Sequence, residues 1–325
     1  MLPVLAESRE REIVATTRAM ATDVTIKIAP TGGTSHLHDL DETINAALEI
    51  FHAVERACTR FDPTSPLMRA NASPSRWHKV PHVLYETLKE ASSAHQRTAG
   101  RFDPRILGDL IALGYDRSLA FANGDVVTAQ RVARPPSGQT RRPWRPRFRG
   151  ASLEVLLGEA VDLGGIGKGL AVRWSSRALA SRATNYMVEA GGDCYCAGSA
   201  PDGGNWRVGI EDPFFGDEPV AVLSLRDRAV TTSSIRLRQW RAGGENVHHL
   251  IDPRTGRPGG GDLVAVTVVG KDPAAAEIDS KSLFLAGRRI ARAASRRGVA
   301  ALWVDASGAV NSTANMRRYV LWERS

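Results

Sequence analysis

The sequence predicts an α+β fold, and three observations indicate this class. Candidate helices and strands follow one another in a mixed order, several strands of the second half resemble hairpins, and no internal repeat of about 20 to 50 residues is present. Of the 325 residues, 42% are apolar, which is enough for a sizeable core, and the 30 glycines and 17 prolines indicate many turns. This order is less typical of a doubly wound parallel sheet.

The first half of the chain is predicted to contain one strand and two long helices. Val24–Ile28 is β-branched and alternates in polarity, which is typical of a strand. Leu40–Cys58 and Pro81–Thr98 carry apolar side chains at helical spacing. The stretch at about 122–150 is rich in arginine and proline and poor in apolar residues, so we expect an excursion from the core.

The second half is predicted to be mainly β. Leu153–Leu163 is expected to form a strand, a turn and another strand, followed by a helix over Lys168–Ala183. We expect Val220–Leu225 and Arg228–Thr232 to pair as a hairpin. The other expected elements are strands over Tyr186–Ala190, Trp206–Ile210, His248–Ile251, Leu263–Val269 and Ala300–Val304, and helices over Ala274–Ala286 and Ile290–Arg297.

The chain is basic, with a net charge of +8. Arginines cluster at 141–149 and 288–297, which we interpret as a solvated loop and a solvated helix face. No nucleic-acid-binding module is recognised, so nucleic acid is not an expected partner, although an acidic partner on 141–149 remains an alternative. Three cysteines in no framework spacing argue against a disulfide-built domain. Without a signal peptide or a run of about 18 apolar residues, we expect a cytoplasmic protein with no membrane span.

The sharpest chemical feature is the segment from Asp162 to Gly169, with the sequence Asp-Leu-Gly-Gly-Ile-Gly-Lys-Gly. Glycines allow a ligand to approach the backbone, and a helix N-terminus offers free N–H groups and a partial positive charge. Lys168 would add a point charge and Asp162 a carboxylate at the rim. The segment is therefore either a phosphate-binding turn or a tight structural turn with a solvated lysine.

Other polar groups stand at strand ends or in turns. His248 and His249 precede a turn at Asp252–Gly256, and one of them could act as a general base or simply be a strand residue. Gly191-Gly192-Asp193 and the hydroxyl cluster Thr231–Ser234 end predicted strands. No Gly-x-Ser-x-Gly nucleophile motif occurs.

Taken in order, these motifs resemble the ApbE-like FAD:protein FMN transferase family. Its opening Met-Gly-Thr is similar to Met20-Ala21-Thr22, and further matches follow in the family order up to about Gly287. These matches are Phe61 to Asn71, Gly100 to Pro104, Asp162 to Gly169, Gly191 to Asp193, Trp206 to Pro213, Thr232-Ser233, and His249 to Gly256.

The resemblance implies a fold and an activity. It implies a T-fold-related mixed sheet with flanking helices and a central flavin cleft, in one domain over 19–325 after an N-terminal extension of residues 1–18. The implied activity moves FMN from FAD to a Ser or Thr of an acceptor protein, releases AMP and uses Mg²⁺. His249 would be the base, and Gly165 and Glu277 would bind the metal. FAD would contact Met20, Phe61, Arg101, Phe102, Asp103, Asp162, Lys168, Thr232 and Ser233.

The metal site departs from the family pattern, which has Asp and, four residues later, Thr. Here these positions are Glu277 and Lys281, and their i, i+4 spacing keeps both on one helix face. Glutamate can bind metal, but a protonated lysine cannot. Lys281 would either replace the cation beside the pyrophosphate or pair with Glu277, so the standard Mg²⁺ site is in question. The alternative function is an FAD-binding protein of the same fold that acts as a carrier, sensor or slow hydrolase.

Overall fold

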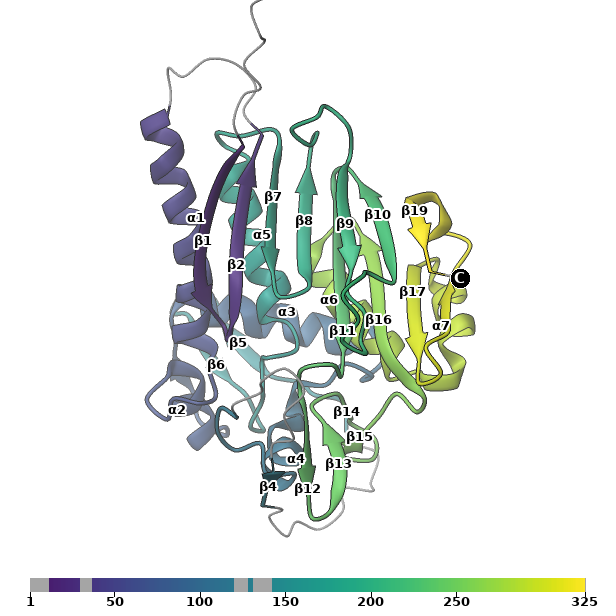
Figure 1. The fold of residues 1–325 in the computed structure, drawn as a ribbon. Helices are drawn as coiled ribbons and strands as arrows, with labels where there is room; N and C mark the ends of the chain where they lie inside the picture. The colour runs from purple at the N-terminus through teal and green to yellow at the C-terminus, as the bar shows by residue number, and fades with distance from the viewer. Residues whose placement is uncertain (1–11, 30–36, 120–127, 131–141, 325) are drawn as a thin grey trace, which may run out of the picture.

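An antiparallel sheet of eight strands forms the centre of the fold in this computed structural model, which describes residues 12–29, 37–119, 128–130 and 142–324 (Figure 1). Both halves of the chain contribute strands, and every neighbouring pair is antiparallel. In sheet order the strands are β1 (Ile13–Ala19), β2 (Thr22–Ile28), β7 (Tyr186–Ala190), β8 (Asp193–Ala197), β11 (Arg228–Ser234), β16 (Leu263–Gly270), β17 (Ala300–Asp305) and β18 (Val310–Ser312). With the helices below, this confirms the predicted α+β class.

The large sheet is buried on both faces. Val266 and Val268 of β16 belong to the core that includes helix residues, whereas Ala265 and Val269 point to the opposite face. The helices on the first face are α1 (Leu37–Cys58), α5 (Gly167–Leu179), α6 (Pro273–Phe284) and α7 (Ile290–Arg297), the last after a short turn η2 (Gly287–Arg289). On the second face lies a small sheet of β9 (Trp206–Ile210), β10 (Ala221–Leu225) and β19 (Val320–Glu323), preceded by η3 (Arg317–Tyr319).

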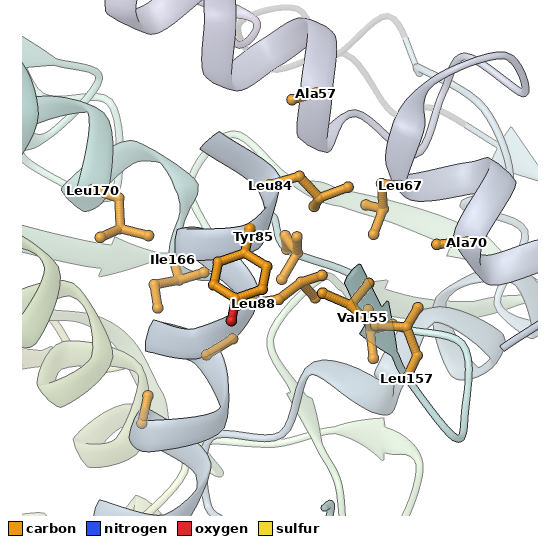
Figure 2. Packing of buried hydrophobic residues seen from close by; sticks show 14 of the residues in the cluster. Ala57, Leu67, Ala70, Leu84, Tyr85, Leu88, Val155, Leu157, Ile166 and Leu170 are labelled. Carbon is orange, nitrogen blue, oxygen red and sulfur yellow. The ribbon is translucent and has the colours of Figure 1, made fainter. Parts of the chain in front are cut away.

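The lower part of the molecule in Figure 1 supports one end of the large sheet. Its helical elements are α2 (Pro66–Ala72), α3 (His82–Arg97), η1 (Pro104–Ile106) and α4 (Leu107–Ala112). Its short strands are β3 (His78–Lys79), β4 (Thr128–Ala129), β5 (Arg147–Arg149), β6 (Glu154–Leu156), β12 (Gln239–Ala242), β13 (Glu245–His248), β14 (Ile251–Asp252) and β15 (Arg257–Pro258). Figure 2 shows Ile166 and Leu170, at the start of α5, in one apolar cluster with Leu84, Tyr85 and Leu88 of α3. This cluster fixes the start of α5.

The predicted second strand within Leu153–Leu163 is absent. Only Glu154–Leu156 is a strand, although Leu157, Val161 and Leu163 are buried. The backbone of Val161 pairs with a side chain, because Asn71 donates to its carbonyl at 2.8 Å and accepts from its N–H at 2.9 Å. The apolar residues Leu157, Val161 and Leu163 are therefore buried as the sequence suggested, but their backbone does not pair with a neighbouring strand.

Two other strand predictions were also wrong in pairing or length. β10 and β11 do not form a hairpin, because β10 pairs with β9 and β19 while β11 pairs with β8 and β16. The chain crosses between the two sheets at Arg226–Asp227. The predicted strand His248–Ile251 is interrupted, because the Leu250 N–H bonds to Nδ1 of His248 at 3.2 Å rather than to a neighbouring strand.

The sheet also begins earlier than predicted. Residues 13–18, placed in the N-terminal extension by the sequence, belong to β1 and pair with β2. Of the arginine- and proline-rich stretch, 122–127 and 131–141 lie outside the described residues. Within its described part, Trp144 is only 2% exposed and donates its indole N–H to the Leu157 carbonyl at 2.9 Å. Across the described ranges, no helix is long and apolar enough to cross a membrane.

Helices α5 and α6 approach each other closely at Gly169, so a side chain at this position should lower the free energy of unfolding. A Cβ at Gly169 would lie 2.9 Å from backbone atoms of Ala274 and Pro273. Gly→Ala in a helix usually stabilises by about 1 kcal/mol, but overpacking here should cost about 1–3 kcal/mol, so Gly169→Ala should destabilise the protein in urea unfolding.

Gly167→Ala is the matched control. The nearest atom to a Cβ at Gly167 would be Cε at the flexible end of Met20, 3.0 Å away, and Cγ1 of Val54 would lie at an ordinary contact distance of 3.7 Å. We expect a change within about 1 kcal/mol. Equal stability of the two variants would contradict a tight crossing at Gly169.

Candidate functional site

The segment Asp162–Gly169 lies where the chain enters α5. Asp162 accepts a hydrogen bond from the Gly164 N–H at 2.9 Å and forms a salt bridge with Nε of Arg60 at 3.0 Å. The helix begins at Gly167, so Lys168 lies in its first turn as predicted. The segment thus combines a fixed carboxylate, a glycine turn and a helix N-terminus, an arrangement suited to an anion.

Lys168 is held by the start of β8. Its ammonium group contacts the buried carboxylate of Asp193 and lies 3.5 Å from the Gly191 carbonyl. Burial raises the pKa of Asp193, and Lys168 opposes this effect. The sequence analysis placed Asp193 at the end of a predicted strand without a role of its own, yet this residue holds the predicted phosphate-binding lysine.

Glu277 and Lys281 pair on one face of α6. The Lys281 ammonium lies 2.9 Å from Oε1 of Glu277, and Oε2 accepts the Gly169 N–H at 2.8 Å. Glu277 is 0% exposed, and the Lys281 side chain is 16% exposed. Burial acts to raise the pKa of Glu277, but the charges of Lys281 and Lys168 hold it below its usual value. The pairing alternative of the sequence analysis is therefore what the structure contains.

Gly165 lies beside the Lys281 stem. A Cβ at Gly165 would be 3.1 Å from Cε2 of Phe102 and 3.5 Å from Cδ of Lys281. Phe102 is buried in the same core as the start of α5. The structure therefore brings together Gly165, Phe102, Lys281 and Glu277, four of the positions predicted from sequence.

Two predicted cofactor contacts flank this segment. Met20 lies in the turn of the β1–β2 hairpin, where its N–H donates to Glu55 at 2.8 Å and its side chain approaches Gly167. Both Met20 and Ala21 have positive φ, 55° and 59°. Phe61 is 41% exposed, and its ring packs on the Arg60 guanidinium, 4.2 Å from the ring centroid. An exposed aromatic ring offers a surface for a planar ligand.

Arg60 was missed by the sequence analysis. Its guanidinium packs on the rings of both Phe61 and Tyr115 and also contacts Asp162. Its Nη2 atom is buried and has no hydrogen-bond partner among the described residues. Arg60 directly precedes the Phe61-Asp62-Pro63 turn and belongs to no motif or spacing pattern of the sequence that would indicate a role.

Asp103 and Arg101 differ in how freely their side chains could contact a ligand. Asp103 is buried, and both its carboxylate oxygens bond to Arg105, at 2.9 Å and 2.7 Å. Arg101 is half-buried and donates to the Leu285 carbonyl at 3.3 Å, which links the Gly100–Pro104 loop to the end of α6. Burial lowers the pKa of Arg101, and the nearby Arg254 and Arg289 add to this effect.

Thr232 and Ser233 point to opposite faces of the large sheet. Thr232 bonds to the Thr267 hydroxyl at 2.9 Å, while Ser233 bonds to Ser280 of α6 at 2.7 Å. Ser280 in turn donates to the Glu277 carbonyl at 3.0 Å. Only Ser233 therefore belongs to the helix face that holds Asp193, Glu277 and Lys281.

His249 lies between β13 and β14 and is partly buried. Its Nδ1 lies 3.3 Å from the Arg238 carbonyl, and because a carbonyl only accepts, the proton is on Nδ1 and Nε2 keeps a lone pair. Burial lowers the pKa of His249 well below the usual value, and Arg238, His248 and Lys281 add to this effect. The imidazole is therefore neutral near pH 7, as a general base requires.

Comparisons with known proteins agree on one family. The sequence model described as the ApbE family matches residues 20–303. An FAD:protein FMN transferase of Treponema pallidum is 28% identical over 261 residues, covering 73% of this chain and 69% of that protein. An FAD:protein FMN transferase of Rhodobacter capsulatus is 31% identical over 241 residues, which cover 72% of this chain and 45% of that protein.

Solved structures share the fold. The crystal structure of the ApbE protein of Thermotoga maritima has a TM-score of 0.77 at 25% identity, and covers 97% of this chain and 100% of that one. Flavin transferase ApbE from Vibrio cholerae has a TM-score of 0.75 at 24% identity, and covers 95% and 99%.

The neutral state of His248 in the folded protein should make the free energy of unfolding depend on pH. Burial lowers the pKa of His248 to about 4, and its Nδ1 accepts the Leu250 N–H, so the folded state holds it neutral. As pH falls below about 6.5, His248 is protonated in the unfolded state but not yet in the folded state. Its contribution to the free energy of unfolding is therefore fully present above about pH 6.5 and is lost progressively down to about pH 4. Between about pH 7.5 and about pH 5, this one group should cost about 2 kcal/mol.

Urea unfolding of the wild type and of His248→Gln at the two pH values measures this contribution. The uncharged variant should lose less stability on acidification. A loss as large as that of the wild type would show that His248 does not cause the acid sensitivity.

Proposed function

Because the chain belongs to the ApbE family, we propose that it is an FAD:protein FMN transferase, which moves FMN from FAD to a Ser or Thr hydroxyl of an acceptor protein and releases AMP. The name shared by its curated relatives supports this activity. The observation that carries it is the charge arrangement at the start of α5, where Lys168 and Lys281 stand at a glycine turn and a helix N-terminus. Such a cradle suits the pyrophosphate of FAD.

The residues around this cradle would hold the two halves of FAD. Lys168 and the N-terminus of α5 would bind the pyrophosphate, and Asp162 the adjoining ribose. Met20, Phe61 and Phe102 offer apolar surface for the rings, and Arg101 and Ser233 would line the site. Thr232 points to the opposite face of the sheet, where it bonds to Thr267, so we do not assign it a ligand contact. Asp103 has both oxygens on Arg105, so we assign it to holding the loop in place rather than to a ligand contact.

The chemistry is a substitution at the phosphorus atom of the FMN half. The acceptor hydroxyl oxygen forms a bond to this phosphorus, and the bond to the bridging oxygen breaks. AMP leaves with the electron pair, and the hydroxyl proton passes to Nε2 of His249. Positive charge beside the pyrophosphate stabilises the leaving group.

Transfer is measured most directly with FAD and total protein of the native host. Covalent flavin is followed by fluorescence after denaturing electrophoresis, and AMP is quantified in the same reaction. A transferase yields AMP together with a fluorescent acceptor band. A slow hydrolase yields AMP and free FMN without a band, and a carrier or sensor yields neither, so either result would contradict the proposal.

His249→Gln tests the base. We expect transfer to fall about 10²-fold or more with FAD affinity unchanged, since a general base contributes to the reaction and not to binding. Because the pKa of His249 lies below its usual value, the wild-type rate should stay flat as pH decreases through about 6.5 and fall only at lower pH. Undiminished transfer by the variant, or a wild-type loss centred near pH 6.5, would remove His249 from this role.

A further inference from the structure

Four charged side chains from three elements form a compact group at the proposed pyrophosphate site. Lys168 of α5 contacts Asp193 of β8, and Lys281 of α6 contacts Glu277 of the same helix. Both carboxylates are almost fully buried, and each ammonium group is only partly exposed. Two positive and two negative charges balance, so the group is neutral before any ligand binds.

The Lys281 side chain lies against the anion-binding segment. Its methylene stem lies against Gly165, where a Cβ would be 3.5 Å from Cδ and 3.6 Å from Cε. Its partner Glu277 accepts the Gly169 N–H at 2.8 Å, so the carboxylate joins the ammonium to the first turn of α5. An ammonium has three N–H donors, and among the described residues Lys281 donates to Glu277, which leaves donors for a ligand.

The surrounding donors do not fit a Mg²⁺ ion. Mg²⁺ requires near-octahedral oxygen ligands, and the carboxylate expected to supply them, Glu277, already binds an ammonium and a backbone N–H. The neighbouring acids are engaged, since Asp193 pairs with Lys168 and Asp279 with Arg297. Among the described residues, no group of three or more His, Cys, Asp or Glu is placed to hold a metal. A divalent ion at Glu277 would also have to lie beside the Lys281 charge.

We propose that Lys281 is the resident cation of this site: its ammonium binds the pyrophosphate of FAD at Gly165, and the protein binds FAD without a divalent metal. The proposal rests on the proposed function, because it assumes that FAD is the ligand. When the pyrophosphate arrives, its negative charges meet Lys281 and Lys168 together with the helix N-terminus. Glu277 keeps Lys281 charged and aimed at the segment, so it acts as a positioning residue.

FAD affinity with and without magnesium tests this proposal. Fluorescence quenching of FAD by the purified full chain is titrated in EDTA and in millimolar magnesium chloride. The wild type should bind equally well in both, within about twofold. Binding that requires magnesium would overturn the inference but leave the proposed function standing. No FAD binding in either buffer would overturn the proposed function itself.

Lys281→Met removes the charge and keeps the length of the side chain. We expect FAD affinity to fall about tenfold or more, since a charge-assisted contact is lost. Riboflavin, which lacks the pyrophosphate, should bind the variant as it binds the wild type. An equal loss for both ligands, or no loss for FAD, would contradict a pyrophosphate contact.

Three further variants separate this role from folding and from general charge. Lys271→Met removes an exposed positive charge next to α6, and FAD affinity should not change. Glu277→Gln with Lys281→Met removes both charges, so no buried carboxylate is left unpaired, and it should still lose FAD affinity selectively.

Lys281→Thr supplies an oxygen ligand beside Glu277, so its FAD affinity should be restored by magnesium, and Mn²⁺ should bind it in an electron paramagnetic resonance titration. Failure of magnesium to restore FAD binding would contradict the assignment.

Discussion

The carboxylate of Glu277 is the contact on which the proposed site depends. It is fully buried, and it joins α6 to the first turn of α5 through the Gly169 N–H while its other oxygen holds Lys281. Removing one partner of such a buried pair costs about 3–5 kcal/mol, because the remaining charge has no water to solvate it. The position of Lys281 beside Gly165 is therefore enforced by the core and not left to a mobile side chain.

The rest of the structure keeps the two helices in the required place. The absence of a side chain at Gly169 lets α5 approach the backbone of α6 closely. Asn71 fixes the chain just before Asp162 by bonding both backbone groups of Val161. Ile166 and Leu170 anchor the same turn in the α3 core. A glycine turn that would otherwise be adaptable is thus held rigid, which favours a preorganised anion site.

Sequence reasoning succeeded where periodicity and local chemistry determine structure. The helix that begins near Lys168 and the strand Tyr186–Ala190 follow from spacing alone. The i, i+4 spacing also offered the pairing of Glu277 with Lys281 as one of two alternatives, and the structure contains it. It failed where distant contacts decide. The supposed strand before Leu163 bonds to the Asn71 side chain. β10 and β11 separate into two sheets because β10 pairs with the preceding strand β9 and with the distant β19, whereas β11 pairs with β8 and β16. Arg60 and Asp193 entered the site only through such long-range contacts.

In the proposed site, an ammonium of the chain occupies the place of a metal ion beside the pyrophosphate. A crystal structure with FAD, grown in the presence of Mn²⁺ and measured at a wavelength where manganese scatters anomalously, tests this most directly. We expect Nζ of Lys281 within hydrogen-bonding distance of a pyrophosphate oxygen and no anomalous peak at Glu277. A manganese peak bound to Glu277 and the pyrophosphate, with Lys281 turned away, would contradict it.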